Sequence, residues 1–210
     1  MLKSKKARPR GAAGAASLFA LGMFFSCCGC SKSFSFDSSD YQPRKIVYVL
    51  DRSDSMCDSF HFVKYELKRS VGELTDSDKF HIIFFSSGPP VEMPPRQLVL
   101  ATERNKKMAF EFIDGVVPQG ETDPSKALER AFYCHPELIY LLTDGEFTPE
   151  VVRLVKDLNK DGKVKLHTIA FLYKTGEPVL KQIAAENGGV YKFVSESDVA
   201  ALAYPREVTP

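Results

Sequence analysis

Near residue 50 an apolar run gives way to an acid and two serines, in the segment IVYVLDRSDSM. Asp51, Ser53 and Ser55 occupy alternate positions in it. An irregular loop would place these three side chains on one side, whereas a regular helix would separate them. Such oxygens at the end of a buried strand can cap a helix, bind a cation or take part in chemistry, so their role depends on what other loops bring to them.

Two other polar loops carry the same kinds of oxygen atoms. Thr122 lies in the glycine-containing segment PQGETD, and Asp144 follows the apolar run LIYLL. Two carboxylates combined with neutral hydroxyls are typical ligands of a hard divalent cation, either Mg²⁺, which keeps some of its own waters, or Mn²⁺. The sequence therefore predicts a magnesium or manganese site if folding brings the three loops together.

The elements that must position these loops begin with four apolar runs, at 46–50, 80–85, 138–142 and 166–172. None shows clean alternation of apolar and polar residues, which is typical of strands covered on both faces of a parallel sheet. A shorter run at 98–100 follows two prolines, so we expect it at a sheet edge.

Amphipathic helical patterns alternate with the strands. Apolar residues recur every three or four positions in 63–74, 108–116 and 151–158, and a last helix at 179–186 precedes a strand at 190–194. This alternation predicts an α/β, doubly wound fold, in which a mostly parallel central sheet is flanked by helices.

In an open parallel sheet, ligands bind outside the carboxyl ends of the strands, where the strand order reverses. In the commonest doubly wound order, the first and fourth strands are neighbours at that reversal. With 138–142 as the fourth strand, the three polar loops meet at one edge and bring two aspartates and three hydroxyls together.

The three loops, in this order and context, resemble the metal-ion-dependent adhesion site of von Willebrand factor type A domains. The resemblance covers about residues 44–204 and implies that fold. It also implies that the hydroxyls bind the metal directly, and that the carboxylates bind it directly or through water, which gives the ligand set Asp51, Ser53, Ser55, Thr122 and Asp144. The resemblance further implies a protein partner, which supplies an acidic residue to the cation.

The chain departs from that pattern at two positions where many members of the family have glycine. Asp54 follows Ser53, and Glu121 precedes Thr122. Both residues add negative charge near the site, which would strengthen cation binding and oppose an acidic ligand. Because Asp54 lies in an irregular loop, we expect its side chain to point to solvent, where screening weakens the repulsion.

Each polar loop also has a simpler explanation. Ser53 and Ser55 would cap the helix expected to begin near Ser59, and Asp144 would open a turn with Gly145. A metal-assisted hydrolase is a further alternative, supported by the pair of aspartates. The first motif is Asp-x-Ser rather than Asp-x-Asp, and no Gly-x-Ser-x-Gly motif occurs.

Other candidate ligands lack metal spacing. The four histidines, His61, His81, His135 and His167, are predicted to fall on a helix, at strand starts or in a turn. Cys57 follows the first strand, whereas Cys134 precedes the fourth strand, so the two lie at opposite edges of the sheet. We therefore predict that they do not form a disulfide bond.

The beginning of the chain has a targeting pattern. MLKSKKARPR is strongly positive, and the uncharged GAAGAASLFALGMFFSCCGC follows it, which predicts that the rest of the chain lies outside the cytoplasm. Residues 1–30 are interpreted as a cleaved signal peptide or an N-terminal membrane anchor. A third interpretation is lipidation, because three residues resemble the lipid-accepting cysteine of bacterial lipoproteins: Cys27, Cys28 and Cys30.

The remaining organisation is a flexible serine-rich linker at 31–43, the folded domain at 44–204 and a tail at 205–210. The net charge of +1 over 210 residues gives no electrostatic basis for binding nucleic acid. The leading hypothesis is a non-enzymatic, metal-dependent protein-binding module exposed in the cell envelope. A metal-independent scaffold in an envelope complex is the alternative that needs the fold but not the cation.

Overall fold

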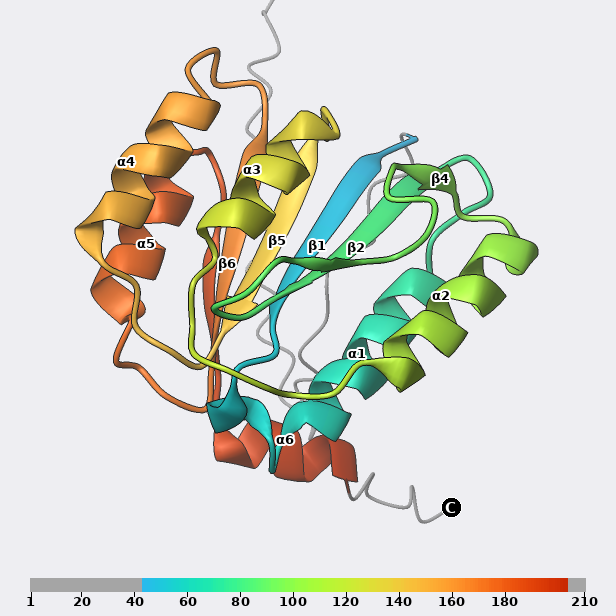
Figure 1. Ribbon diagram of the computed structural model, residues 1–210, viewed down its shortest axis with the longest axis horizontal. Coiled ribbons are helices and arrows are strands. Elements are labelled where there is room, and N and C mark those ends of the chain that lie inside the picture. The colour runs from blue at the N-terminus through green and yellow to red at the C-terminus, as the bar shows by residue number, and fades with distance from the viewer. Residues whose placement is uncertain (1–42, 204–210) are drawn as a thin grey trace, which may run out of the picture. The chain divides into compact units, whose positions relative to one another are not determined.

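The computed structural model describes residues 43–203. The predicted targeting segment, the tail at 205–210 and all of the predicted linker except Pro43 lie outside the described residues. Within the described part, the fold is the predicted one, because strands and helices alternate and most strands are parallel (Figure 1).

Seven strands form one sheet: β1 Lys45–Asp51, β2 Lys79–Phe85, β3 Val91–Glu92, β4 Val99–Leu100, β5 Leu138–Thr143, β6 Lys165–Phe171 and β7 Tyr191–Val194. The order across the sheet is β3-β2-β1-β5-β6-β7, and β4 also pairs with β2. β3 and β4 are antiparallel to β2, whereas the remaining pairs are parallel.

The long strands begin and end within one residue of the predicted apolar runs, and the predicted edge position of 98–100 is confirmed by β4. β1 lies between β2 and β5, so the strand order reverses where it was predicted to. β3 was not predicted. With only two residues, it is too short to carry a periodic pattern.

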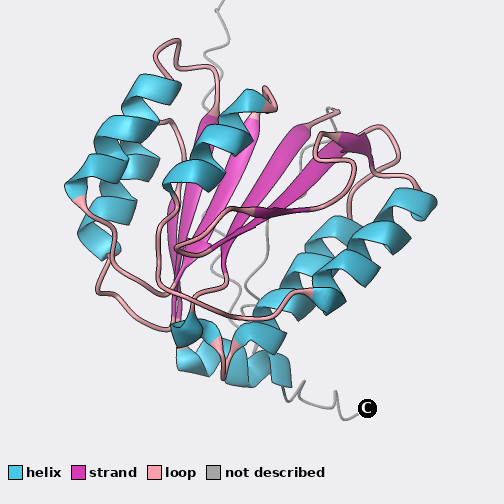
Figure 2. Ribbon diagram, viewed as in Figure 1, coloured by secondary structure: helices cyan, strands magenta, loops and turns pink. Residues whose placement is uncertain are grey.

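Helices cover both faces of the sheet (Figure 2). α1, α2 and α6 pack on one face, and α3, α4 and α5 pack on the other. A short 3-10 helix, η1, follows β1. The bounds are η1 Asp54–Met56, α1 Phe60–Gly72, α2 Glu103–Gly115, α3 Ser125–Tyr133, α4 Pro149–Leu158, α5 Glu177–Glu186 and α6 Glu196–Ala203. Because both faces are covered, β1 is buried from its second residue to its last, which explains its continuous apolar sequence.

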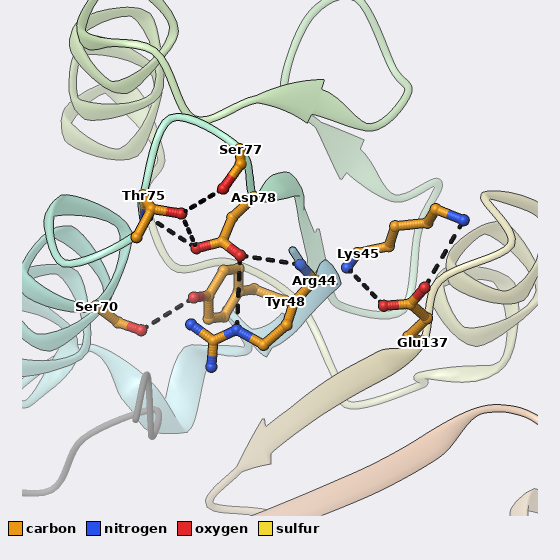
Figure 3. A network of polar contacts seen from close by, with 8 residues as sticks. All are labelled: Arg44, Lys45, Tyr48, Ser70, Thr75, Ser77, Asp78 and Glu137. Carbon is orange, nitrogen blue, oxygen red and sulfur yellow. Dashed lines mark hydrogen bonds and ion pairs between the residues drawn. The ribbon is translucent and has the colours of Figure 1, made fainter. Parts of the chain in front are cut away.

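Polar contacts fix the amino end of β1 (Figure 3). Asp78 accepts hydrogen bonds from the backbone N–H groups of Arg44 and Thr75, both at 2.9 Å. The Tyr48 hydroxyl is hydrogen-bonded to Ser70 of α1 at 3.0 Å inside the core. These contacts hold the strand in register, so that its carboxyl end delivers Asp51 to a defined place.

Candidate metal site

The site begins where two neighbouring parallel strands end. β1 ends at Asp51 and β5 ends at Thr143, and the preceding residues Leu50 and Leu142 are paired in the sheet. Asp51 and Thr143 are both fully buried, and the Thr143 hydroxyl donates a hydrogen bond to Asp51 Oδ2. The same hydroxyl accepts a hydrogen bond from the Gly145 N–H at 3.0 Å, so one side chain ties the first loop to the turn after β5.

The first loop continues this network. The Ser53 N–H donates to Asp51 Oδ1 at 2.8 Å, and the Ser53 and Ser55 hydroxyls are hydrogen-bonded at 3.1 Å. Ser55 then donates to Asp144 Oδ1 at 2.8 Å. Four of the five predicted ligands therefore belong to one chain of hydrogen bonds across two loops.

Thr122 reaches the same place from the third loop. A Cβ atom added to Gly145 would lie only 3.2 Å from Thr122 Oγ1 and 3.1 Å from its methyl carbon. The half-buried Thr122 side chain thus packs directly on the residue after Asp144. The structure brings all five predicted ligands to one edge of the sheet.

Backbone contacts hold the third loop against the first. The Asp54 N–H donates to the Gly120 carbonyl at 2.9 Å, and the Gln119 N–H donates to the Arg52 carbonyl at 2.7 Å. Gly120 has a φ of +80°, and a Cβ atom there would lie 3.0 Å from Ser87 Oγ. Glycine is therefore required by both the conformation and the close approach of Ser87.

The two carboxylates are poorly stabilised without a cation. Burial raises the pKa of Asp51 to about 6, although the hydrogen bonds from Thr143 and Ser53 act to lower this pKa. Burial also raises the pKa of Asp144. Asp144 Oδ2 is buried and accepts no hydrogen bond from the described residues. A divalent cation would offset the cost of burying these charges, and the oxygen-rich ligand set fits Mg²⁺ or Mn²⁺.

The helix-capping explanation of the serines is wrong. Ser53 is the N-cap residue of η1, but its side chain makes no capping hydrogen bond with a backbone N–H of that helix. α1 has Ser59 at its N-cap and begins at Phe60, so Ser55 lies a full turn too early to cap it. Asp54 is exposed, as expected, and Glu121 is exposed too.

Sequence reasoning missed three supporting residues. Thr143 directly follows the apolar run at 138–142, but no local pattern pairs its hydroxyl with Asp51. Ser87 follows β2 at the same sheet edge, and its hydroxyl accepts a hydrogen bond from the Glu121 N–H at 3.1 Å. The sequence feature that could have identified Ser87 is its position just after a predicted parallel strand. Arg52 carried no such signal, because its burial, with only 5% of its surface exposed, depends on tertiary packing.

The remaining candidates occupy the predicted elements. His61 lies on α1, His81 and His167 each stand third in a strand, and His135 lies in a turn with a φ of +50°. Within residues 43–203, no three histidine, cysteine, aspartate or glutamate side chains gather as a metal site. The candidate site has only two carboxylates and takes its other ligands from hydroxyls.

Both cysteines in the described part have free thiols. Cys57 follows η1 at the carboxyl edge of the sheet, and Cys134 follows α3 just before β5. The structure thus agrees with the prediction that they are not bonded to each other.

An α/β fold with three polar loops at the strand-order reversal defines a class of domain, and comparison with known proteins identifies it. Residues 44–193 match the von Willebrand factor type A domain family. The chain therefore belongs to this family, whose domains are generally protein-interaction modules.

Relatives show the same domain inside much longer proteins. The chain is 29% identical over 188 residues to inter-alpha-trypsin inhibitor heavy chain H4 of Bos taurus, covering 80% of this chain and 20% of the relative. It is 29% identical over 152 residues to human von Willebrand factor A domain-containing protein 3B, covering 70% of this chain and 12% of the relative. The chain thus spans a fifth or less of the length of these two relatives.

Solved structures support the fold. The von Willebrand factor type A protein from Catenulispora acidiphila superposes with a TM-score of 0.66 at 23% identity, covering 78% of this chain and 41% of that chain. The PilB minor pilin from Streptococcus sanguinis gives a TM-score of 0.58 at 13% identity, covering 79% of this chain and 60% of that chain. Among the described helices, none has the length and apolar character needed to cross a membrane.

Proposed function

We propose that this domain is a protein-binding module that depends on a divalent cation, Mg²⁺ or Mn²⁺. The observation that carries the proposal is the buried Asp144 Oδ2, which accepts no hydrogen bond from the described residues, while the other oxygen of the same carboxylate accepts one from Ser55 of the first loop. A cation is the partner that this oxygen lacks. The proposed ligands are Asp51, Ser53, Ser55, Thr122 and Asp144.

In this proposal the chain's own residues have distinct tasks. Thr143 and the Ser53 N–H orient the Asp51 carboxylate through both of its oxygens. Ser55 orients Asp144 and leaves its second oxygen free. When bound, the cation would supply an open coordination position for an oxygen of a partner. Because two carboxylates at most neutralise a divalent ion, we infer that the partner offers an acidic residue.

We propose a binding role rather than a catalytic one. Asp51 is fully buried, and each of its oxygens already accepts a hydrogen bond, so it is poorly placed to act as a nucleophile or a general base. The exposed Asp54 and Glu121 add negative charge around the mouth of the site. Solvent screens both charges, so they weaken the attraction for an acidic partner without cancelling it.

The test is calorimetric titration of Mg²⁺ and Mn²⁺ into the purified chain. Asp51→Ala combined with Thr122→Ala should abolish cation binding while the domain stays folded, as judged by circular dichroism. Asp54→Ala removes the same charge from the same loop at an exposed position, and it should bind the cation nearly as well as the wild type. Undiminished affinity in the double variant would refute the site and favour a metal-independent scaffold.

We further propose that residues 44–204 lie outside the cytoplasm, in the cell envelope, held by the N-terminal segment or released after its cleavage. The support is the positive, then uncharged, beginning of the chain. A reporter that is active only after export, fused after Pro210, should be active. Activity of a matched reporter that works only in the cytoplasm would contradict the proposal.

A further inference from the structure

Arg52 stands between two proposed metal ligands and carries a buried charge. Only 5% of its surface is exposed. Its Nη1 donates to the Val117 carbonyl at 3.2 Å, and, with the Gln119 amide turned, both Nη atoms lie 3.1 Å from the Gln119 side-chain oxygen. Among the described residues, no carboxylate pairs with Arg52, and its Nε is buried without an acceptor.

In two other arginines, the guanidinium edge formed by Nε and Nη2 pairs with a carboxylate. Arg69 directs Nε and Nη2 at Glu66, at 3.1 and 2.8 Å. Arg130 directs the same two atoms at the two oxygens of Glu92, both at 3.0 Å. On Arg52, Nη2 of this edge lies against the neutral Gln119 amide, and Nε has no acceptor among the described residues. Burying a guanidinium without a counterion is unfavourable, so an anion in that place would be strongly held.

A cavity of about 400 Å³ borders Arg52. Its walls are mostly apolar, formed by Val91, Phe112, Val116 and Val117. Val117 is 60% exposed at the surface, whereas Val116 is buried. The exposed Glu111 also lines the cavity, and its charge opposes an anion, although solvent screens it. One buried cation among aliphatic and aromatic walls suits a side chain with an apolar stem and a carboxylate end.

The cavity lies beside the metal site. Arg52 is flanked by Asp51 and Ser53, and its carbonyl accepts the hydrogen bond from Gln119, three residues before Thr122. Resting on the proposed function, we propose that the protein partner presents two acids to this domain: one binds the cation, and the side chain of the second enters the cavity and pairs with Arg52. Arg52 is thus a determinant of partner specificity next to the metal.

The probe is a random peptide display library selected on the immobilised wild-type chain in Mg²⁺, with affinities of the selected peptides measured by fluorescence anisotropy. Selected peptides should contain two acids. Arg52→Gln should weaken their binding about tenfold or more, as expected for loss of a charge-assisted hydrogen bond. Arg52→Lys keeps the positive charge but lacks the two parallel N–H donors of the guanidinium group, so it should give a smaller loss of affinity. Arg153→Gln, the same change at an exposed site on α4, should have no effect.

The assignment to one peptide acid comes from a double-mutant cycle. Changing that acid to its amide should weaken binding to the wild type but not to Arg52→Gln, while changing the other acid should weaken both. Mg²⁺ affinity and thermal stability of Arg52→Gln verify that the site itself is intact. If chelator abolishes binding and no selected peptide depends on Arg52, the present proposal is overturned and the proposed function stands. If Arg52 matters and chelator does not, the proposed function fails and the Arg52 pocket stands.

Discussion

The two aspartates of the site are held in different ways. Asp51 accepts a hydrogen bond at each oxygen and is fixed in a fully buried position, whereas Asp144 accepts one from Ser55 and keeps Oδ2 free. The first carboxylate therefore has a defined orientation, and the second offers an open coordination position. The spacing of the ligands could be read from the sequence because alternate positions in a loop share a side. Which oxygen each carboxylate leaves free depends on hydrogen-bond partners from other strands, and no local pattern predicts those.

Thr143→Val tests the importance of that orientation. The change keeps the shape of the side chain and removes the hydroxyl that donates to Asp51 and accepts from Gly145. We expect a loss of about 1–3 kcal/mol in the free energy of unfolding, since a buried carboxylate oxygen loses its donor, together with weaker Mg²⁺ binding. Urea denaturation and calorimetric titration measure the two effects.

Thr168→Val is the matched control for Thr143→Val. Thr168 is also fully buried in a strand, and its hydroxyl donates to the Leu180 carbonyl at 2.9 Å. It should reduce stability by a similar amount without changing Mg²⁺ affinity. Equal Mg²⁺ affinities for both valine variants would show that Thr143 is only a core residue.

At the level of elements, the long strands and their order could be predicted because burial on both faces leaves continuous apolar runs and because parallel connections follow few topologies. β3 could not be predicted. Its role is to carry Glu92, which contacts His81 of β2 at 3.1 Å and pairs with Arg130 of α3. The contact between Gly176, before α5, and Gly145, after β5, could not be predicted either, because it joins segments that are distant in sequence.

Gly176→Ala tests that contact. A Cβ atom on Gly176 would lie 2.5 Å from the Gly145 carbonyl oxygen, closer than packing allows. We expect a loss of about 1–3 kcal/mol in stability, as for other overpacked sites, and weaker Mg²⁺ binding because Gly145 adjoins Asp144 and Thr122. Gly88→Ala is the control, since a Cβ atom there meets nothing within 4 Å. A Gly176→Ala variant as stable as Gly88→Ala would contradict the close approach.

The contact between β2 and β3 predicts a pH dependence. Burial lowers the pKa of His81, although Glu92 opposes this shift, and Arg130 acts in the same direction as burial. In the unfolded chain the pKa of this histidine is about 6.5, whereas folded His81 takes up its proton at a lower pH. Its contribution is thus present above pH 6.5 and is lost as the pH falls, with a limiting slope of about 1.4 kcal/mol per pH unit.

Urea denaturation between pH 7 and pH 5 measures the total slope, to which Asp51 contributes with the opposite sign because its pKa is raised to about 6 in the folded domain. The contribution of His81 is therefore the difference between the wild type and His81→Gln, which should lose less stability as the pH falls because the ionisable ring is gone while the amide can still donate to Glu92. His135→Asn, at an exposed turn, should retain the wild-type slope. Identical slopes for all three proteins would mean that His81 does not carry the effect.

For the whole molecule, cation binding and folding are linked. An ion that binds only the folded domain should raise its free energy of unfolding by about 2.7 kcal/mol when the free ion is at a hundredfold excess over the dissociation constant. We expect Mg²⁺ to raise the melting temperature relative to chelator, and the Asp51→Ala and Thr122→Ala double variant to show no such shift. A wild-type melting temperature that is the same in Mg²⁺ and in chelator would argue against the site.

The hydrogen bonds from Asp54 to Gly120 and from Gln119 to Arg52 join the first and third loops directly through the backbone. The loops are therefore preorganised, and an arriving ion meets a template whose conformational entropy was lost during folding. Association should then be a single kinetic phase, whose observed rate rises linearly with ion concentration and does not level off at an isomerisation step. In that case selectivity between Mg²⁺ and larger ions such as Ca²⁺ arises from the rigidity of the template, which adapts poorly to longer metal–oxygen distances.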